Sequence, residues 1–237
     1  AKAWSDFAAH IPLIRSFSMG DNFTRLVQGK APEYPLFPGE PIRYHFGFYA
    51  LVGLLEKIGV RIDWALNIPS SLGFFFLVVM IWIVTKELFK DARVAFLSLL
   101  FFLFNGSLSF INFFKQHPLS WSTPMDIITN SRFPSFGPWD GGNISAFWTI
   151  NIYTNQRHLA WAFAMGTWFL VWVTRNQDHH WKTTIPVTVL WGVVIGALPY
   201  FHQPMTLIMA VLLSTYFLFF RHMRLSLFVI GAISLTL

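Results

Sequence analysis

The first candidate for chemistry is a carboxylate four residues before an imidazole, near the start of the chain. Asp6 and His10 occur in the stretch WSDFAAH, and a spacing of four places two side chains on the same face of a helix. A carboxylate at a membrane edge is partly desolvated, which makes it a stronger base. We predict that Asp6 is a catalytic base and that His10 contacts substrate. The alternative is a helix cap or an interfacial salt bridge.

Arginine, tyrosine and histidine side chains recur where apolar segments begin or turn. Arginine presents a planar pair of donors to a phosphate group. Polar side chains that enter an apolar helix are costly unless they bind something, although helix-end polarity and snorkelling are the alternative explanation. The predicted substrate-binding set from these segments consists of Arg15, Arg43, Tyr44, His45, Arg157, His158 and His202.

The long polar segment 115–157 is a second candidate for substrate contact. It contains the stretch GPWDGGN with Asp140. Aromatic faces stack on sugar rings, and carboxylates and amides share hydrogen bonds with hydroxyl groups. We predict that Asp140 contacts a sugar or an acceptor, with an interfacial loop held by aromatic anchors as the alternative.

Redox and metal chemistry have little support in the residue types. The chain has no cysteine, so thiolate nucleophiles and zinc–thiolate sites are excluded. No HxxxH pattern or carboxylate cluster occurs. We predict no metal site and no cofactor; one divalent cation held by Asp6 and a distant acidic residue remains an alternative.

The composition identifies the class of protein that must position these side chains. The 237 residues are 54% hydrophobic and 12% charged, whereas soluble domains carry about 25% charge. A cytosolic enzyme, a disordered chain and a coiled coil are therefore excluded. The net charge of +6 fits basic cytoplasmic loops better than nucleic-acid binding. We predict an all-α polytopic membrane protein in contact with the lipid bilayer.

Six apolar segments are predicted as membrane spans because most of them are long enough to cross about 30 Å of hydrocarbon. The last is too short to span, so we expect the sequence to be a piece of a longer protein. The predicted transmembrane region, 64–237, contains spans at 64–85, 94–114, 158–174, 183–200, 204–220 and 225–237.

Short basic loops predict the orientation of this bundle. Loops 86–93, 175–182 and 221–224 are rich in lysine and arginine, and such loops face the cytoplasm. Segments 1–63 and 115–157 are then both extracytoplasmic.

The segment 42–59 has two interpretations. Its uninterrupted apolar stretch has only 10 residues, from Phe46 to Leu55, which rise about 15 Å as a helix. We predict a helix that lies in the membrane interface, because charges flank a short aromatic stretch. The alternative is a further span, which would place residues 1–41 in the cytoplasm.

The order of these features resembles the N-terminal half of GT-C superfamily glycosyltransferases, over about residues 1–114. The features are an early Asp6, a short aromatic helix, DWALNIPS at 63–70 and the basic turn KELFKDAR at 86–93. The similarity is greatest to the bacterial branch that is related to protein mannosyltransferases and lipid A aminoarabinose transferases. The sequence departs from the family pattern at Asp6, which follows serine rather than forming an Asp-Glu pair, and at Asn67, where the family has arginine.

This resemblance implies a function and a location. Such enzymes transfer a sugar from a polyprenyl-phosphate donor to an acceptor at the extracytoplasmic face, with inversion, and their early acidic residue activates or orients the acceptor. The implied location is the bacterial inner membrane, with a first helix before Ala1. The acceptor is not implied.

A transporter or lipid-handling protein without bond chemistry is the alternative function. Transporters place ionisable residues in the middle of spans. The five complete spans here carry no aspartate, glutamate, lysine or arginine between their ends, which favours chemistry at one membrane face.

Overall fold

The computed structural model describes residues 7–105, 110–129, 149, 152–153, 156–176 and 185–236. Within these ranges every regular element is a helix, and pairing of extended backbone is limited to one isolated bridge between Glu33 and Pro41. The described part of the chain is therefore all-α, as predicted. The elements are α1 (Phe7–Ser18), α2 (Asn22–Val27), α3 (Gly47–Lys57), α4 (Ile62–Phe89), α5 (Ala92–Leu103), α6 (Phe110–Gln116), α7 (Thr123–Thr129), α9 (Arg157–Asn176), α10 (Ile185–Phe201), α11 (Gln203–Phe219), the 3₁₀ turn η1 (Arg221–Met223) and α12 (Arg224–Thr236).

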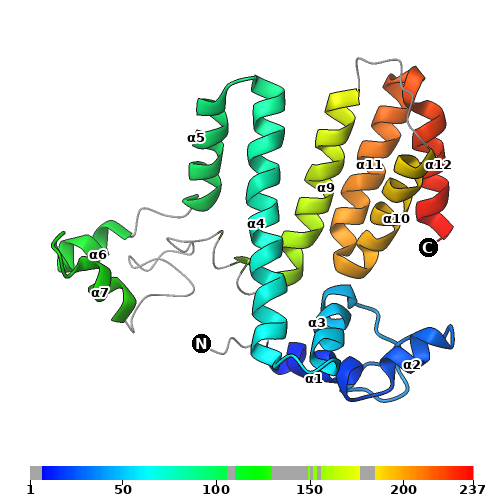
Figure 1. The fold of residues 1–237 in the computed structure, drawn as a ribbon, viewed down its shortest axis with the longest axis horizontal. Coiled ribbons are helices and arrows are strands. Elements are labelled where there is room, and N and C mark those ends of the chain that lie inside the picture. The colour runs from blue at the N-terminus through cyan, green and yellow to red at the C-terminus, as the bar shows by residue number, and fades with distance from the viewer. Residues whose placement is uncertain are drawn as a thin grey trace.

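The long apolar helices form an upright bundle (Figure 1). α4 has 28 residues, about 42 Å at 1.5 Å per residue, and among the described residues it alone is long and apolar enough to cross a membrane. Shorter apolar helices accompany it: α5, α11, α12 and residues 186–201 of α10. The predicted helices at 64–85, 158–174, 183–200, 204–220 and 225–237 correspond to α4, α9, α10, α11 and α12. Whether the bundle crosses a membrane stays a prediction.

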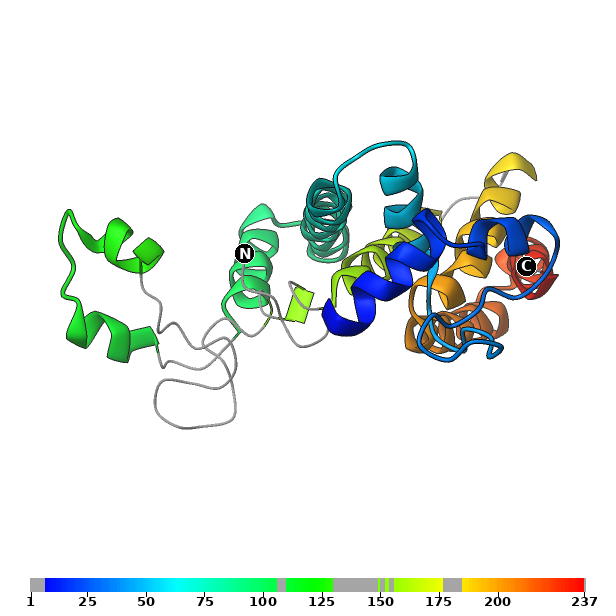
Figure 2. The same ribbon diagram turned by 90° about the horizontal axis from the view of Figure 1, so that it is seen from below.

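The prediction of one helix over 94–114 is wrong. α5 ends at Leu103, and Phe104 has left the helical conformation. The sequence continues with Asn105 and Gly106, and both residue types weaken a helix interior. Residues 106–109 lie outside the described part, and α6 begins at Phe110. α6 and α7 lie to the side of α5, away from the bundle (Figures 1 and 2).

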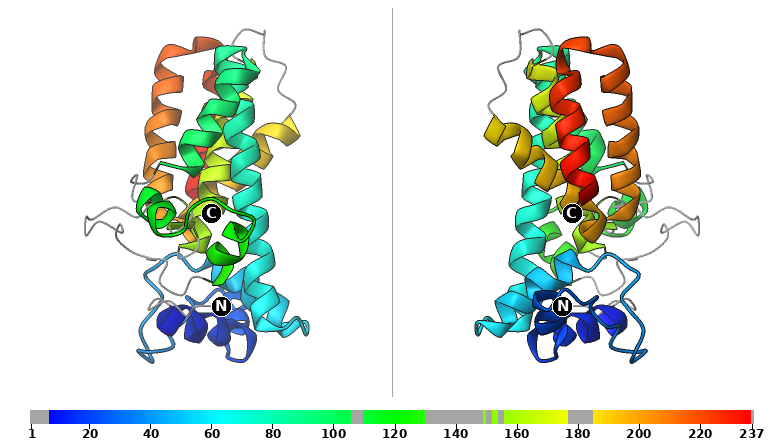
Figure 3. Two further views of the ribbon diagram at one scale, coloured as in Figure 1. Left: turned by 90° about the vertical axis from the view of Figure 1, so that its left-hand side faces the viewer. Right: turned by 90° about the vertical axis from the view of Figure 1, so that its right-hand side faces the viewer.

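The N-terminal segment contains more structure than the sequence predicted. We expected a polar loop with one helix over about 42–59, whereas the structure has α1, α2 and the shorter α3. α1 packs against α3, and their apolar side chains join the start of α4 in one core that includes Ile14, Phe17, Val52 and Ala65. This N-terminal layer lies across one end of the bundle (Figure 3).

The opposite end of the bundle carries the basic turns. Arg175, at the end of α9, forms an ion pair with Glu87 of α4, with 2.7 Å between nitrogen and oxygen. The sequence predicted that loops 86–93 and 175–182 share one side, and this contact places Glu87 and Arg175 at the same end. The α10–α11 turn lies at the other end, next to the N-terminal layer (Figure 1).

α4 and α9 make the most extensive contact between two helices of the bundle. Gly73 of α4 lies directly against the Trp161 indole, and a Cβ atom at position 73 would be 2.6 Å from ring atoms. The Trp161 Nε1 group also donates a hydrogen bond of 2.8 Å to the Pro69 carbonyl oxygen. The missing side chain of Gly73 therefore permits the close approach that joins these helices.

The substitution Gly73→Ala should lower the melting temperature. The added methyl group overpacks the interface, which costs about 1–3 kcal/mol and exceeds the gain of about 1 kcal/mol that alanine brings to a helix. Gly231→Ala in α12 is the matched control, because a Cβ there meets nothing within 4 Å. Thermal unfolding in detergent, followed by circular dichroism, measures both. An equal rise in melting temperature in both variants would contradict the close packing of Gly73 against Trp161.

Candidate functional site

Three histidines from three separate elements meet where the N-terminal layer contacts the bundle. The ring centroids of His45 and His158 are 3.8 Å apart, and His202 lies 5.8 Å from His45 and 5.7 Å from His158. We call His45, His158 and His202 the histidine cluster. The sequence predicted each as a substrate-binding residue, and the structure brings all three together.

Local structure explains how each imidazole reaches this point. His158 is the second residue of α9. His202 is the N-cap of α11, and its Nδ1 atom accepts a hydrogen bond from the Met205 N–H group. His45 precedes α3, whose first residue is Gly47. A Cβ at Gly47 would lie 2.9 Å from the Tyr200 carbonyl oxygen. This glycine therefore allows α3, and His45 with it, to approach the end of α10.

Aromatic side chains and a fourth histidine surround the histidine cluster. The ring of Tyr44 lies 3.5 Å from that of His45, and Tyr49 lies 6.2 Å from His158. His10 of α1 lies 4.9 Å from Tyr49. His10 and Tyr44 were predicted from the sequence. Tyr49 was missed, because a tyrosine inside an apolar helix gives no local signal of a site.

His45 and His158 are deeply buried and incompletely hydrogen-bonded, whereas His202 is partly exposed. His45 is 6% exposed and His158 is 1% exposed. The His45 Nε2 and His158 Nδ1 atoms have no hydrogen-bond partner within the described part of the chain. Burial, together with the nearby His202 and His10, lowers the pKa of His45 from 6.5 to about 4, and burial also lowers the pKa of His202. At neutral pH both are therefore uncharged.

Arg157 immediately precedes His158 in the sequence, and its side chain is hydrogen-bonded to α4. Its Nη1 group donates to the Asn67 Oδ1 atom at 2.6 Å and to the Ser70 Oγ atom at 3.5 Å. Neither Asn67 nor Ser70 was predicted as a site residue, although both occur in the stretch DWALNIPS.

Two cavities lie in the N-terminal layer, and Tyr34 and Tyr44 line both of them. None of the three cluster histidines lines either cavity; Tyr44, whose ring lies 3.5 Å from that of His45, connects the cavities to the cluster. The inner cavity, about 380 Å³, is also lined by His10 and Gln156. The outer cavity, about 400 Å³, is also lined by Arg43, whose side chain is largely exposed and 3.5 Å from Glu40. A ligand could therefore contact His10, Tyr44 and Arg43 along one path. The sequence did not identify Tyr34 or Gln156.

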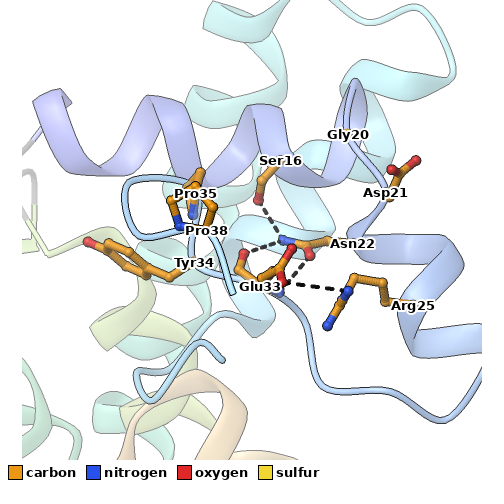
Figure 4. A pocket seen from close by; sticks show the side chains of 9 residues that line it. All are labelled: Ser16, Gly20, Asp21, Asn22, Arg25, Glu33, Tyr34, Pro35 and Pro38. Atoms are coloured by element: carbon orange, nitrogen blue, oxygen red, sulfur yellow. Dashed lines mark hydrogen bonds and ion pairs between the residues drawn. The ribbon is translucent and has the colours of Figure 1, made fainter. Parts of the chain in front are cut away.

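A third cavity, about 250 Å³, lies between α1, α2 and the proline-rich segment formed by residues 32–41 (Figure 4). Its central residue is Asn22, which donates to Ser16 and to the Glu33 carbonyl oxygen and accepts from the Glu33 N–H group. These bonds satisfy the buried amide. We interpret Asn22 as the residue that holds the proline-rich segment against α1.

The remaining predicted residues have different outcomes. Arg15 pairs with Glu56 of α3 at 2.9 Å, and Ser18 also donates to Glu56, so Arg15 contributes to packing of α1 on α3. Asp6 and Asp140 lie outside the described residues. Within the described ranges, no group of three or more histidine or acidic side chains is arranged to hold a metal ion.

Comparisons with known proteins add no family assignment. No family model matches the chain, and neither the curated proteins nor the solved structures gave a significant match. The resemblance to GT-C glycosyltransferases therefore stays a prediction.

Protein stability should decrease as the pH falls from about 6.5 toward about 4. The pKa of His45 is about 4 in the folded protein and 6.5 without the fold, so the unfolded chain binds more protons between these values, and protonation favours unfolding. His45→Asn should flatten part of this dependence, measured by denaturant unfolding at several pH values. His117→Asn, outside the cluster, should keep the wild-type slope. If the pH dependence of stability in His45→Asn equals that of the wild type, the lowered pKa of His45 is not its cause.

Proposed function

We propose that this protein is an inverting membrane glycosyltransferase that moves a sugar from a polyprenyl-phosphate donor to an acceptor at the extracytoplasmic face of a bacterial inner membrane. The observation that carries the proposal is the gathering of His10, Tyr44, His45, Arg157, His158 and His202 at one end of an apolar helix bundle. A lipid phosphate lies at such a boundary between apolar and polar surroundings.

The surfaces beside this polar end are suited to a lipid-linked substrate. Many apolar side chains on the bundle helices are exposed, among them Phe75 of α4, Phe101 of α5 and Leu207 of α11. Hydrocarbon tails are the natural surroundings of such side chains. A polyprenyl chain would remain in the lipid while its phosphate and sugar reach the cavities beside Tyr34 and Tyr44.

The proposed reaction is a single displacement. The Asp6 carboxylate accepts the proton of the acceptor hydroxyl or amine, and the acceptor atom forms a bond to the anomeric carbon of the sugar. The bond between that carbon and the phosphate oxygen breaks, and its electron pair leaves with the phosphate. Attack opposite to the leaving group inverts the anomeric centre. The protein contributes placement of the reactants and electrostatic stabilisation.

Cationic and polar side chains would bind the phosphate. Arg157 is oriented by Asn67 and Ser70, and Arg43 lines the outer cavity. Guanidinium groups match the geometry of phosphate oxygens. Aromatic rings of Tyr34 and Tyr44 provide faces for a sugar.

Asp6→Asn should abolish most turnover without loss of donor binding. The change removes the base while keeping nearly the same shape, and loss of a general base typically costs 10²–10⁴ in rate. The measurement is transfer of a radiolabelled sugar from a panel of polyprenyl-phosphate hexoses by the protein in nanodiscs. Near-wild-type turnover of Asp6→Asn would show that Asp6 is structural.

Arg157→Gln and Arg43→Gln should weaken donor binding by about tenfold to hundredfold, the size of a hydrogen bond to a charged group. Arg93→Gln is the matched control, because Arg93 lies in the first turn of α5, beside the basic turn at the other end of the bundle. Asn67→Ala keeps the charge of Arg157 and removes the nearer of its two hydrogen-bond partners on α4, so it should have a smaller effect. Equal losses at Arg157 and Arg93 would contradict the proposed site.

A further inference from the structure

The histidine cluster has a property that a fixed cationic site lacks, because its groups are bases held without charge. Three imidazoles lie within 3.8–5.8 Å of one another. Each added positive charge in such a group repels the next. Two ring nitrogens, His45 Nε2 and His158 Nδ1, have no partner within the described part of the chain. Buried polar atoms without partners are rare and costly, which suggests a ligand.

The groups that face the histidine cluster do not supply negative charge at neutral pH. The rings nearest to the cluster are those of Tyr44, 3.5 Å from His45, and Tyr49, 6.2 Å from His158. His10 of α1 lies 4.9 Å from Tyr49, and Phe163 of α9 lies 6.0 Å from His202. Arg157, which precedes His158 in α9, is hydrogen-bonded to Asn67 of α4. The charges that influence His45 electrostatically are those of His202 and His10. Among the described residues the surroundings are therefore basic or neutral, and an anionic ligand would complement them.

We propose that the histidine cluster binds a phosphomonoester and takes up protons as it does so. The proposal rests on the proposed function, because the polyprenyl phosphate released by sugar transfer is a phosphomonoester. An anion within about 4–6 Å favours the charged form of an imidazole, and it offsets the repulsion between neighbouring imidazolium groups. Protonation and phosphate binding therefore support each other, as linkage requires.

This coupling would distinguish the two lipids of the reaction. The donor is a phosphodiester with one negative charge, whereas the released phosphomonoester has a second ionisable oxygen. A site that gains positive charge with its ligand stabilises the additional negative charge more than a site of constant charge does. Charge that develops on the leaving phosphate is the quantity that an enzyme must stabilise during transfer.

Titration calorimetry on the full chain in nanodiscs tests the proposal without sugar transfer. The probes are geranyl phosphate, geranyl sulfate and inorganic phosphate, each at pH 5.5, 6.5 and 7.5 in two buffers of different ionisation enthalpy. Geranyl sulfate keeps a single charge over this range, so its proton uptake belongs to the protein. We expect net proton uptake with both geranyl esters. The affinity for geranyl sulfate should rise as the pH falls, by up to about tenfold per pH unit for each linked proton.

Inorganic phosphate distinguishes the sources of the ligand. Binding that is much weaker than that of geranyl phosphate assigns the site to a lipid headgroup. Equal binding of both assigns it to free phosphate and overturns the lipid part of the proposal.

Two variants locate the proton uptake. His202→Asn should reduce it while the protein stays folded, because asparagine also caps helix N-termini and His202 is the N-cap of α11. His45→Asn should reduce it as well, and His117→Asn should not. Melting temperatures of the unliganded variants identify any loss that comes from misfolding.

Three results would overturn the inference: binding of geranyl sulfate that does not depend on pH, uptake that is unchanged in both cluster variants, or proton release on tight binding of Zn²⁺ in place of phosphate. Proton-coupled binding in a protein that transfers no sugar from any donor would retain the site and refute only the glycosyltransferase proposal.

Discussion

The close contact between α4 and α9 is the constraint on which the candidate site depends. Gly73 admits the Trp161 indole, and Trp161 is hydrogen-bonded to the Pro69 carbonyl oxygen. One turn earlier in α9, Arg157 is bonded to Asn67 of α4. These contacts set the height and rotation of the first turn of α9, and with it the position of His158. A shift of α9 by a fraction of a turn would separate His158 from His45.

Two apolar cores meet at the histidine cluster. One core joins α1, α3 and the start of α4, and the other joins α9, α10, α11 and α12. The ring of Phe201 packs against both cores. The cluster therefore lies at a junction between two units that are each stabilised by burial of apolar area. Uncharged imidazoles are tolerated there, whereas unpaired charged groups would be costly.

The distribution of polar groups along the bundle supports chemistry at one end. At one end Glu87 and Arg175 form an exposed ion pair, and exposed ion pairs contribute little to stability. At the other end His45 and His158 are buried and close together, and each has a ring nitrogen without a partner in the described part of the chain. Retention of such costly groups is typical of functional sites, and this contrast favours the histidine cluster over ordinary polarity at helix ends.

The sequence by itself determined the helical class, the approximate position of most long helices and the residue types of the site, because apolar runs and basic turns are local signals. It did not determine where α5 ends, and it left α1 and α2 as a loop. It also assigned Arg15 to substrate, whereas the packing of α1 on α3 pairs Arg15 with Glu56. His45, His158 and His202 are far apart in the chain, and their meeting depends on helix packing. Only the tertiary structure could place them together, because side-chain distances between separate helices follow from close packing rather than from local periodicity.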